Sequence, residues 1–171
     1  MLDVGCGPRG SLEWATMARE RVGLDPLVAS YKALGIDEHQ MDYAGAPSEA
    51  IPYSDRHFDI VTSFNSLDHV ESLERSISEI GRVLKENGRF LLIVEINHPP
   101  TATEPVSIEH DVLRARLQRE YEMVSWRTYD LPADHHIYAA VKHGVPRLSA
   151  PTGPAILVAS FIRRDAWPDD S

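Results

Sequence analysis

Residues 2–10 read LDVGCGPRG, in which a short apolar run containing an acid leads into three closely spaced glycines. This order is typical of a β-strand that enters a tight turn around a phosphate or a cofactor, because glycine lets the backbone bend and approach a ligand closely. Gly5, Gly7 and Gly10 fit the spacing G-x-G-x-x-G. The spacing alone is a weak signal, and it also allows a dinucleotide.

Beyond this turn, apolar stretches typical of strands alternate with helical patterns. We predict strands over residues 2–5, 21–25, 39–43, 57–65, 89–96, 122–130 and 155–164, and helices over 11–20, 26–34, 72–84 and 107–121. The strand over 89–96 is the most hydrophobic, as expected in the middle of a parallel sheet that is covered on both faces. This alternation predicts an α/β fold with a doubly wound sheet. We expect residues 1–171 to form a single domain.

The composition excludes several classes of protein. The formal net charge is −9, which argues against a nucleic-acid partner, because such binding depends on clustered Lys and Arg. No apolar run approaches the roughly 20 residues that cross a bilayer, and the start lacks the basic region of a signal peptide. The only cysteine is Cys6, so an internal disulfide is excluded. We therefore expect a cytoplasmic protein with no membrane partner.

Two acids near the glycine turn bear on the choice between two cofactors. A pyrophosphate needs free backbone N–H groups and a helix N-terminus, with no carboxylate facing it. S-adenosylmethionine carries an ammonium and a sulfonium group, so it favours an acid at the first strand. Asp3 lies two residues before Gly5, and Asp25 ends the second strand. Asp25 is placed to accept hydrogen bonds from two ribose hydroxyls.

With these residues the chain resembles the class I S-adenosylmethionine-dependent methyltransferases, especially the small-molecule group. The similar segments are LDVGCG at the first turn, GLDP at 23–26, SEAIPYSDRHFDIVTSFNSLDHV at 48–70 and LKENGRFLLIVE at 84–95. The last two strands resemble the family's reversed hairpin. The resemblance implies a Rossmann-like, seven-stranded, mostly parallel sheet with an antiparallel last strand, and S-adenosylmethionine as the cofactor.

The resemblance also implies a set of cofactor contacts. They are Asp3, Gly5, Cys6, Gly7, Asp25, Pro26, Ser48, Glu49, Asn65, Ser66 and Leu67. Cys6 is expected to form a small wall of the pocket rather than act as a nucleophile. Relatives often have G-D-A where this chain has Ala46-Pro47-Ser48, so Ser48 or a nearby backbone group must replace the contact with adenine.

Methyl transfer to a hydroxyl requires a base near the carboxyl ends of the fourth and fifth strands. We predict His98 for this role, with Glu95 and His69 as further candidates. The histidine pairs of the chain have no spacing typical of a closed metal site, so we expect no metal. The long loop over 131–154 is expected to cover the substrate.

These observations predict methyl transfer to a small molecule, specifically to a hydroxyl of a sugar or a secondary metabolite. A non-catalytic or truncated S-adenosylmethionine-binding domain is one alternative, and an NAD-dependent oxidoreductase is a weaker one. The family usually has a helix before the first strand, and here only Met1 precedes Leu2. Either the start is truncated, or a second subunit in a homodimer covers the exposed flank.

Overall fold

A computed structural model describes residues 1–164 of the chain. In this part, seven strands form one sheet in the order β3-β2-β1-β4-β5-β7-β6. The strands are β1 (Leu2–Val4), β2 (Val22–Leu24), β3 (Asp42–Ala44), β4 (Phe58–Phe64), β5 (Leu84–Ile96), β6 (Tyr121–Asp130) and β7 (Ala155–Arg163). Strands β1 to β5 pair in parallel, and β7 is antiparallel to both β5 and β6. The predicted mostly parallel sheet with an antiparallel last strand is confirmed.

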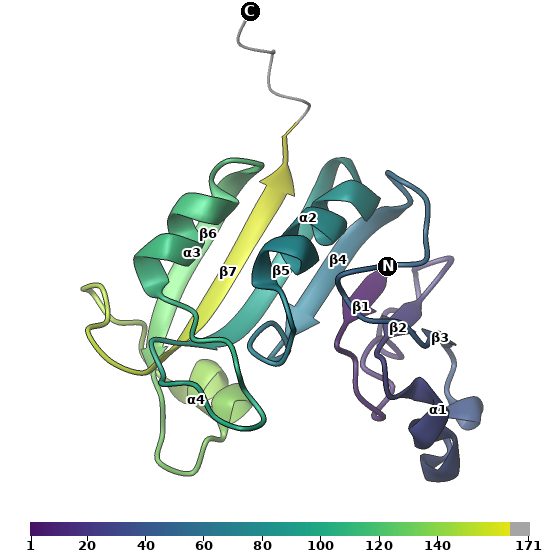
Figure 1. Ribbon diagram of the computed structural model, residues 1–171, viewed down its shortest axis with the longest axis horizontal. Coiled ribbons are helices and arrows are strands. Elements are labelled where there is room, and N and C mark those ends of the chain that lie inside the picture. Colours follow the sequence, from purple (N-terminus) through teal and green to yellow (C-terminus); the bar gives the residue numbers. More distant parts are fainter. Residues whose placement is uncertain (165–171) are drawn as a thin grey trace, which may run out of the picture.

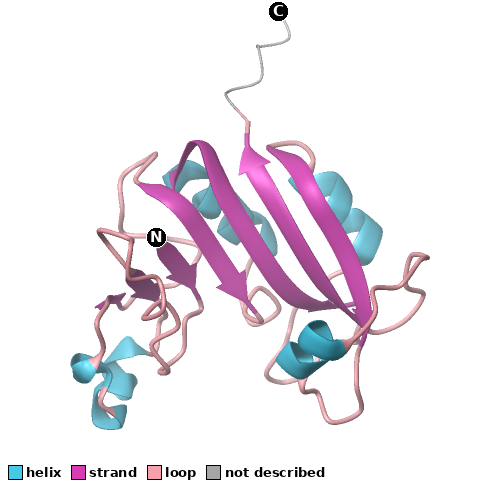
Figure 2. Ribbon diagram, turned by 180° about the vertical axis from the view of Figure 1, so that it is seen from behind, coloured by secondary structure: helices cyan, strands magenta, loops and turns pink. Residues whose placement is uncertain are grey.

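The helices are α1 (Val28–Tyr31), α2 (Leu73–Val83), α3 (His110–Leu117) and α4 (Ile137–His143), and the short 3-10 helices are η1 (Lys32–Leu34) and η2 (Ile36–Glu38). Helices α2 and α3 cover one face of the sheet (Figure 1). The opposite face, seen in Figure 2, carries α4 near the end of β6. No helix among residues 1–164 is both long and apolar enough to cross a membrane.

The main hydrophobic core lies between the sheet and helices α2 and α3. Helix α2 begins after Ser72, whose side-chain oxygen accepts a hydrogen bond from the backbone N–H of Arg75. Its residues Ile77 and Ile80 are fully buried and belong to the same core cluster as Phe90 of β5. Burial of each such side chain contributes about 1.5–3 kcal/mol to folding. This packing fixes β4 and β5, whose carboxyl ends carry part of the candidate site.

The helix expected over 11–20 is a wrong prediction, because this segment forms a series of turns. The turns are held by hydrogen bonds between backbone groups three residues apart, such as that from Ala15 to Leu12. A segment of this length is not helical unless it packs an apolar face. Only Leu12 and Ala15 are buried among its large or apolar side chains, whereas Trp14 and Met17 are exposed.

Two other segments also differ from expectation. The helix expected over 26–34 is divided into α1 and the directly following η1. It ends at Gly35, whose φ of +83° is left-handed. The loop expected over 131–154 contains α4, which packs Ile137 against Tyr129 and Ile156. Its seven residues are too few to stand out as a helical pattern in the sequence.

Candidate functional site

The candidate site lies at the carboxyl ends of β1, β2 and β4. Strand β1 pairs on one side with β2 and on the other with β4, so the order of the strands reverses at β1. In open α/β sheets, ligands bind at the carboxyl ends of the strands beside such a reversal. The LDVGCGPRG segment and the loop after β4 therefore meet at this edge.

Position 5, the first glycine of the turn, requires glycine because of its backbone conformation and the closeness of Ser66. Gly5 has a φ of +71°, a left-handed conformation that L side chains rarely adopt. A Cβ at Gly5 would lie 2.2 Å from the Cβ of Ser66. The Ser66 hydroxyl donates a 2.7 Å hydrogen bond to the carbonyl of Val4, which joins the loop after β4 to the end of β1. Gly7 also has a positive φ, of +59°, but it faces open space.

The carboxylate of Asp25 is built into this turn. One oxygen accepts a 3.2 Å hydrogen bond from the backbone N–H of Gly7. The other accepts hydrogen bonds from the backbone N–H of Leu27 at 2.9 Å and from the Tyr31 hydroxyl at 3.0 Å. The Gly7 N–H therefore faces a carboxylate, and no regular helix follows the turn. Both features disfavour a pyrophosphate, which needs free N–H groups at a helix N-terminus.

Asp3 places a second carboxylate beside the turn. Its side chain is buried, and the Thr62 hydroxyl donates a 2.5 Å hydrogen bond to it. Burial raises the pKa of Asp3 above its usual value. The two acids, Asp3 and Asp25, make this edge favourable for a ligand with positive charge. These acceptor oxygens and the open space at Gly7 fit the ammonium, the sulfonium and the ribose hydroxyls of S-adenosylmethionine.

Cys6 lies between these glycines in an environment that suppresses its reactivity. Its side chain is buried, and its sulfur lies 2.6 Å from the place that a Cβ on Gly23 would occupy. Burial raises the pKa of the Cys6 thiol, and the charges of Asp3 and Asp25 raise it further. Because the thiolate is the reactive form, this environment disfavours Cys6 as a nucleophile. Its expected place in the wall of the pocket stays a prediction.

The loop after β4 adds polar atoms without partners. Asn65 has a φ of +58° and donates its backbone N–H to the Ile93 carbonyl at 2.7 Å. Its side-chain Oδ1 is buried and has no hydrogen-bond partner among residues 1–164. This oxygen is therefore an acceptor available to a ligand. Leu67, two residues later, is fully buried in the core.

Ser48 and Glu49 both have partners that hold the start of α2. One Glu49 oxygen accepts hydrogen bonds from the backbone N–H groups of Glu71 and Ser72, at 2.7 and 2.9 Å. Burial alone would raise the pKa of Glu49, but these N–H donors outweigh it and lower the pKa. The Ser48 hydroxyl lies 2.8 Å from that of Ser76. Pro26 is exposed directly after Asp25. Their contacts with a cofactor stay predictions.

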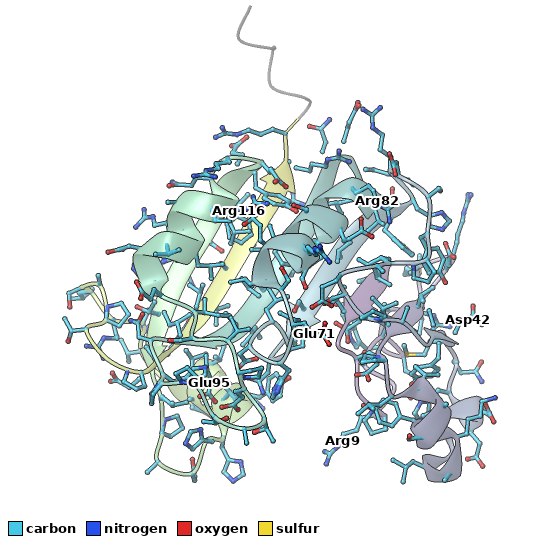
Figure 3. The ribbon with its side chains drawn as sticks, viewed as in Figure 1. Arg9, Asp42, Glu71, Arg82, Glu95 and Arg116 are labelled. Carbon is cyan, nitrogen blue, oxygen red and sulfur yellow. The ribbon has the colours of Figure 1, made fainter. Side chains whose placement is uncertain are left out.

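Glu95, one of the predicted bases, shares a sheet face with Asp3. Asp3 is in register with Thr62, and Thr62 with Leu91. Because side chains alternate along a strand, Glu95 lies on the same face as Leu91. Glu95 is buried, and its Oε1 is 3.4 Å from Nδ1 of His135 in the segment before α4. Figure 3 shows Glu95 at the end of the sheet where α4 lies.

Helix α4 lies on the same face, and its Tyr138 is close enough to Asp3 for the carboxylate charge to affect the Tyr138 hydroxyl. Burial, and then the charge of Asp3, raises the pKa of Tyr138. The segment predicted to cover the substrate thus contributes α4 and His135 to the surroundings of Glu95. Its role as a cover stays a prediction.

The other two predicted bases, His69 and His98, converge on a residue that we did not predict. Their Nε2 atoms lie 3.7 and 3.8 Å from the two carboxylate oxygens of Asp68. Asp68 is fully buried, and neither of its oxygens has a hydrogen-bond partner within residues 1–164. Burial raises the pKa of Asp68, against the lowering effect of His69. Glu104 lies close enough for its carboxylate to share a cation with Asp68 and His69. The adjacent Asp68-His69 pair is the signal that could have indicated this cluster.

A hollow of about 800 Å³ lies elsewhere, at the amino ends of β4 and β5. It is lined by residues such as Trp14, Met17, Phe58 and Lys85. None of the acids described above lines it. Its position at the opposite edge of the sheet separates it from the glycine turn, where the polar groups converge.

Comparisons with known proteins agree with this geometry. The family model described as "Methyltransferase domain" matches residues 2–92. An uncharacterized methyltransferase, YcgJ of Bacillus subtilis, is 30% identical over 99 residues, which cover 54% of this chain and 39% of the relative. The ubiquinone/menaquinone biosynthesis C-methyltransferase UbiE of Shewanella halifaxensis is 32% identical over 87 residues, or 51% of this chain and 29% of the relative. The matched part therefore spans less than half the length of these relatives.

Solved structures share the fold over nearly the whole chain. The crystal structure of Bacillus subtilis YcgJ superimposes with a TM-score of 0.60 at 19% identity, over 96% of this chain and 92% of that one. The 1,6-didemethyltoxoflavin-N1-methyltransferase of Burkholderia thailandensis, solved with S-adenosylhomocysteine, gives a TM-score of 0.64 at 14% identity, over 96% of this chain and 70% of that one. At these identities the likeness concerns the fold alone.

Proposed function

Since this chain belongs to the methyltransferase domain family, we propose that it transfers a methyl group from S-adenosylmethionine to a small-molecule acceptor, at a hydroxyl of a sugar or a secondary metabolite. The observation that carries the proposal is the pair of buried carboxylates, Asp3 and Asp25, at the glycine turn. A cationic cofactor offsets the cost of burying these acids, whereas a pyrophosphate would add to it.

Each part of the turn has a role toward this cofactor, which supplies an electrophilic methyl group on a sulfonium when bound. Asp25 accepts hydrogen bonds from the ribose hydroxyls. A carboxylate has about four acceptor sites. Three of those of Asp25 are in use, so one is free, and displacement of the Tyr31 hydroxyl would free another for the second ribose hydroxyl. Asp3 balances the charge of the ammonium group. Asn65 Oδ1, buried without a partner in the described chain, accepts from the same group.

The acceptor side of the site needs alignment and the loss of one proton. The leaving thioether takes no proton, so positioning supplies much of the rate. A hydroxyl acceptor must give up its proton to a base as it attacks. Of the three predicted bases, Glu95 is favoured by its position on the face of Asp3 and by the nearby His135 Nδ1. His98 and His69 instead direct Nε2 toward Asp68.

A screen of hydroxyl-bearing metabolites tests the activity. Purified protein is incubated with S-adenosylmethionine and the panel, and mass spectrometry follows S-adenosylhomocysteine and acceptors heavier by one CH₂. Once an acceptor is found, Glu95→Gln should lower kcat by about 10²- to 10⁴-fold, because a general base is lost, and leave the Kd for the cofactor unchanged. Glu122→Gln, an exposed acid on β6, is the matched control. An unchanged kcat in Glu95→Gln would remove Glu95 as the base.

The alternatives predict different outcomes in the same screen. A non-catalytic S-adenosylmethionine-binding domain would bind the cofactor and methylate none of the acceptors. An NAD-dependent oxidoreductase would bind NAD instead, which the Gly7 to Asp25 hydrogen bond disfavours.

We propose that two copies of this chain form a homodimer. We also propose that the protein acts in the cytoplasm. Trp14 and Met17 are 67% and 95% exposed, and both line the hollow at the amino ends of the strands. Exposed apolar side chains that gather in this way are typical of contact surfaces. Light scattering of the purified protein distinguishes a dimer from a monomer.

A further inference from the structure

Asp68 presents a buried charge that the protein itself does not satisfy. Its side chain is fully buried, and both carboxylate oxygens lack hydrogen-bond partners among the described residues. A buried carboxylate without partners is costly, and proteins normally pair such groups or use them to bind a metal. A positively charged partner that lies close to both oxygens would stabilise this carboxylate.

Two imidazoles face these oxygens with their lone pairs. Nδ1 of His69 is 2.6 Å from the Thr103 carbonyl, and Nδ1 of His98 is 3.0 Å from the Pro99 carbonyl. A carbonyl oxygen only accepts hydrogen bonds, so both Nδ1 atoms carry the proton. In the neutral ring, each Nε2 then has a free lone pair that points at the carboxylate. A histidine that binds a metal commonly donates its other N–H to a backbone carbonyl in this manner.

We propose that Asp68, His69, His98 and Glu104 bind a divalent cation. The Nε2 atoms lie 3.7 and 3.8 Å from the Asp68 oxygens, and one ligand atom each of Asp68, His69 and Glu104 lies within 4.8 Å of the others. Ligands about 2.1 Å from a tetrahedral zinc ion lie about 3.4 Å apart. A small inward movement of Asp68, His69 and Glu104 therefore brings them into coordination distance, and His98 approaches from the second Asp68 oxygen.

The ligand set also indicates the kind of cation. Two imidazole nitrogens with carboxylate oxygens suit Zn²⁺, Mn²⁺, Fe²⁺ or Co²⁺, whereas Mg²⁺ and Ca²⁺ favour oxygen ligands alone. The His69 side chain is 41% exposed, so the cation has a path from solvent. A direct ion pair between Asp68 and protonated histidines is the competing explanation, but the distances exceed the length of an N–H···O hydrogen bond.

Isothermal titration of the metal-free chain with Zn²⁺ and with Co²⁺ tests this site, without any methyl donor. We expect one cation per chain, a higher unfolding temperature and a Co²⁺ absorption band typical of nitrogen and oxygen ligands. Asp68→Asn and His69→Gln should each weaken binding by about 100-fold or more, since even an outer partner of a metal ligand contributes 10- to 100-fold. His69 is partly exposed, so this variant keeps the test meaningful should Asp68→Asn fail to fold.

Two substitutions outside the cluster serve as controls. His136→Gln removes an exposed histidine and Glu109→Gln an exposed acid, and neither should change the affinity. Absence of stoichiometric binding, or equal affinity in Asp68→Asn and the original chain, would overturn the proposal. Because the cofactor is absent from the titration, this result is independent of whether the chain binds S-adenosylmethionine.

Discussion

Replacing Gly5 by alanine is expected to lower the free energy of unfolding by about 3 kcal/mol. A left-handed conformation costs an L residue about 1–2 kcal/mol, and the new methyl group adds about 1–3 kcal/mol of overpacking. At Gly5 the φ is +71°, and the added Cβ would lie 2.2 Å from Cβ of Ser66. Urea denaturation of both proteins measures the difference. Relief of the clash would separate Ser66 from β1 and disturb the loops that hold the cofactor.

Three further substitutions separate backbone strain from steric crowding at this turn. Adding Ser66→Gly to Gly5→Ala removes the opposing Cβ and should restore the overpacking part of the loss, whereas Ser66→Ala keeps that atom and should not. Gly7→Ala meets open space, so it should cost only the left-handed strain. A loss below 1 kcal/mol in Gly5→Ala would show that the turn adapts easily and that the described contact with Ser66 is not a constraint.

Replacing Asp25 by asparagine is expected to weaken S-adenosylmethionine binding by about 100-fold. Hydrogen bonds to a charged group are worth about 1.5–3 kcal/mol, and each 1.4 kcal/mol changes an affinity tenfold. The amide also turns an N–H group toward the backbone N–H of Gly7 if Oδ1 keeps its bonds from Leu27 and Tyr31. Calorimetric titration with S-adenosylmethionine measures the Kd.

The controls for Asp25 address charge and the neighbouring hydroxyl. Asp37→Asn removes an exposed acid in η2 and should leave the Kd unchanged. Tyr31→Phe removes the hydroxyl that occupies Asp25, so it should not weaken binding. An affinity of Asp25→Asn within threefold of the original would mean that Asp25 only supports the turn and does not contact the ribose.

Much of the fold follows from local patterns in the sequence. The continuous apolar stretch of β5 predicts a central strand, and the segment from Leu2 to Gly7 predicts a strand followed by a tight turn. Tertiary packing decides the remainder. The segment over 11–20 has helical spacing, but only Leu12 and Ala15 find buried positions, so turns replace the helix. Helix α4 is too short for its pattern to be recognised.

The candidate site could likewise be predicted only in part from the sequence. Asp3 and Asp25 could be found because Asp3 lies in the strand that enters the glycine turn and Asp25 directly follows the next strand. The parallel pairing of these two strands brings the acids together. For the Asp68 cluster the adjacent Asp68-His69 pair is the only local signal. The other two members could not be predicted, since Glu104 and His98 reach it from a loop whose path no local pattern specifies. The pairing of Glu95 with His135 depends likewise on α4, which the sequence pattern did not indicate.

Calorimetric titration of the purified chain with S-adenosylmethionine, S-adenosylhomocysteine and NAD in parallel tests the central claim most directly. We expect the first two to bind with micromolar Kd values at one molecule per chain and NAD to give no heat of binding. Binding of NAD alone, or of none of the three, would contradict the assignment of the Asp3 and Asp25 site to S-adenosylmethionine.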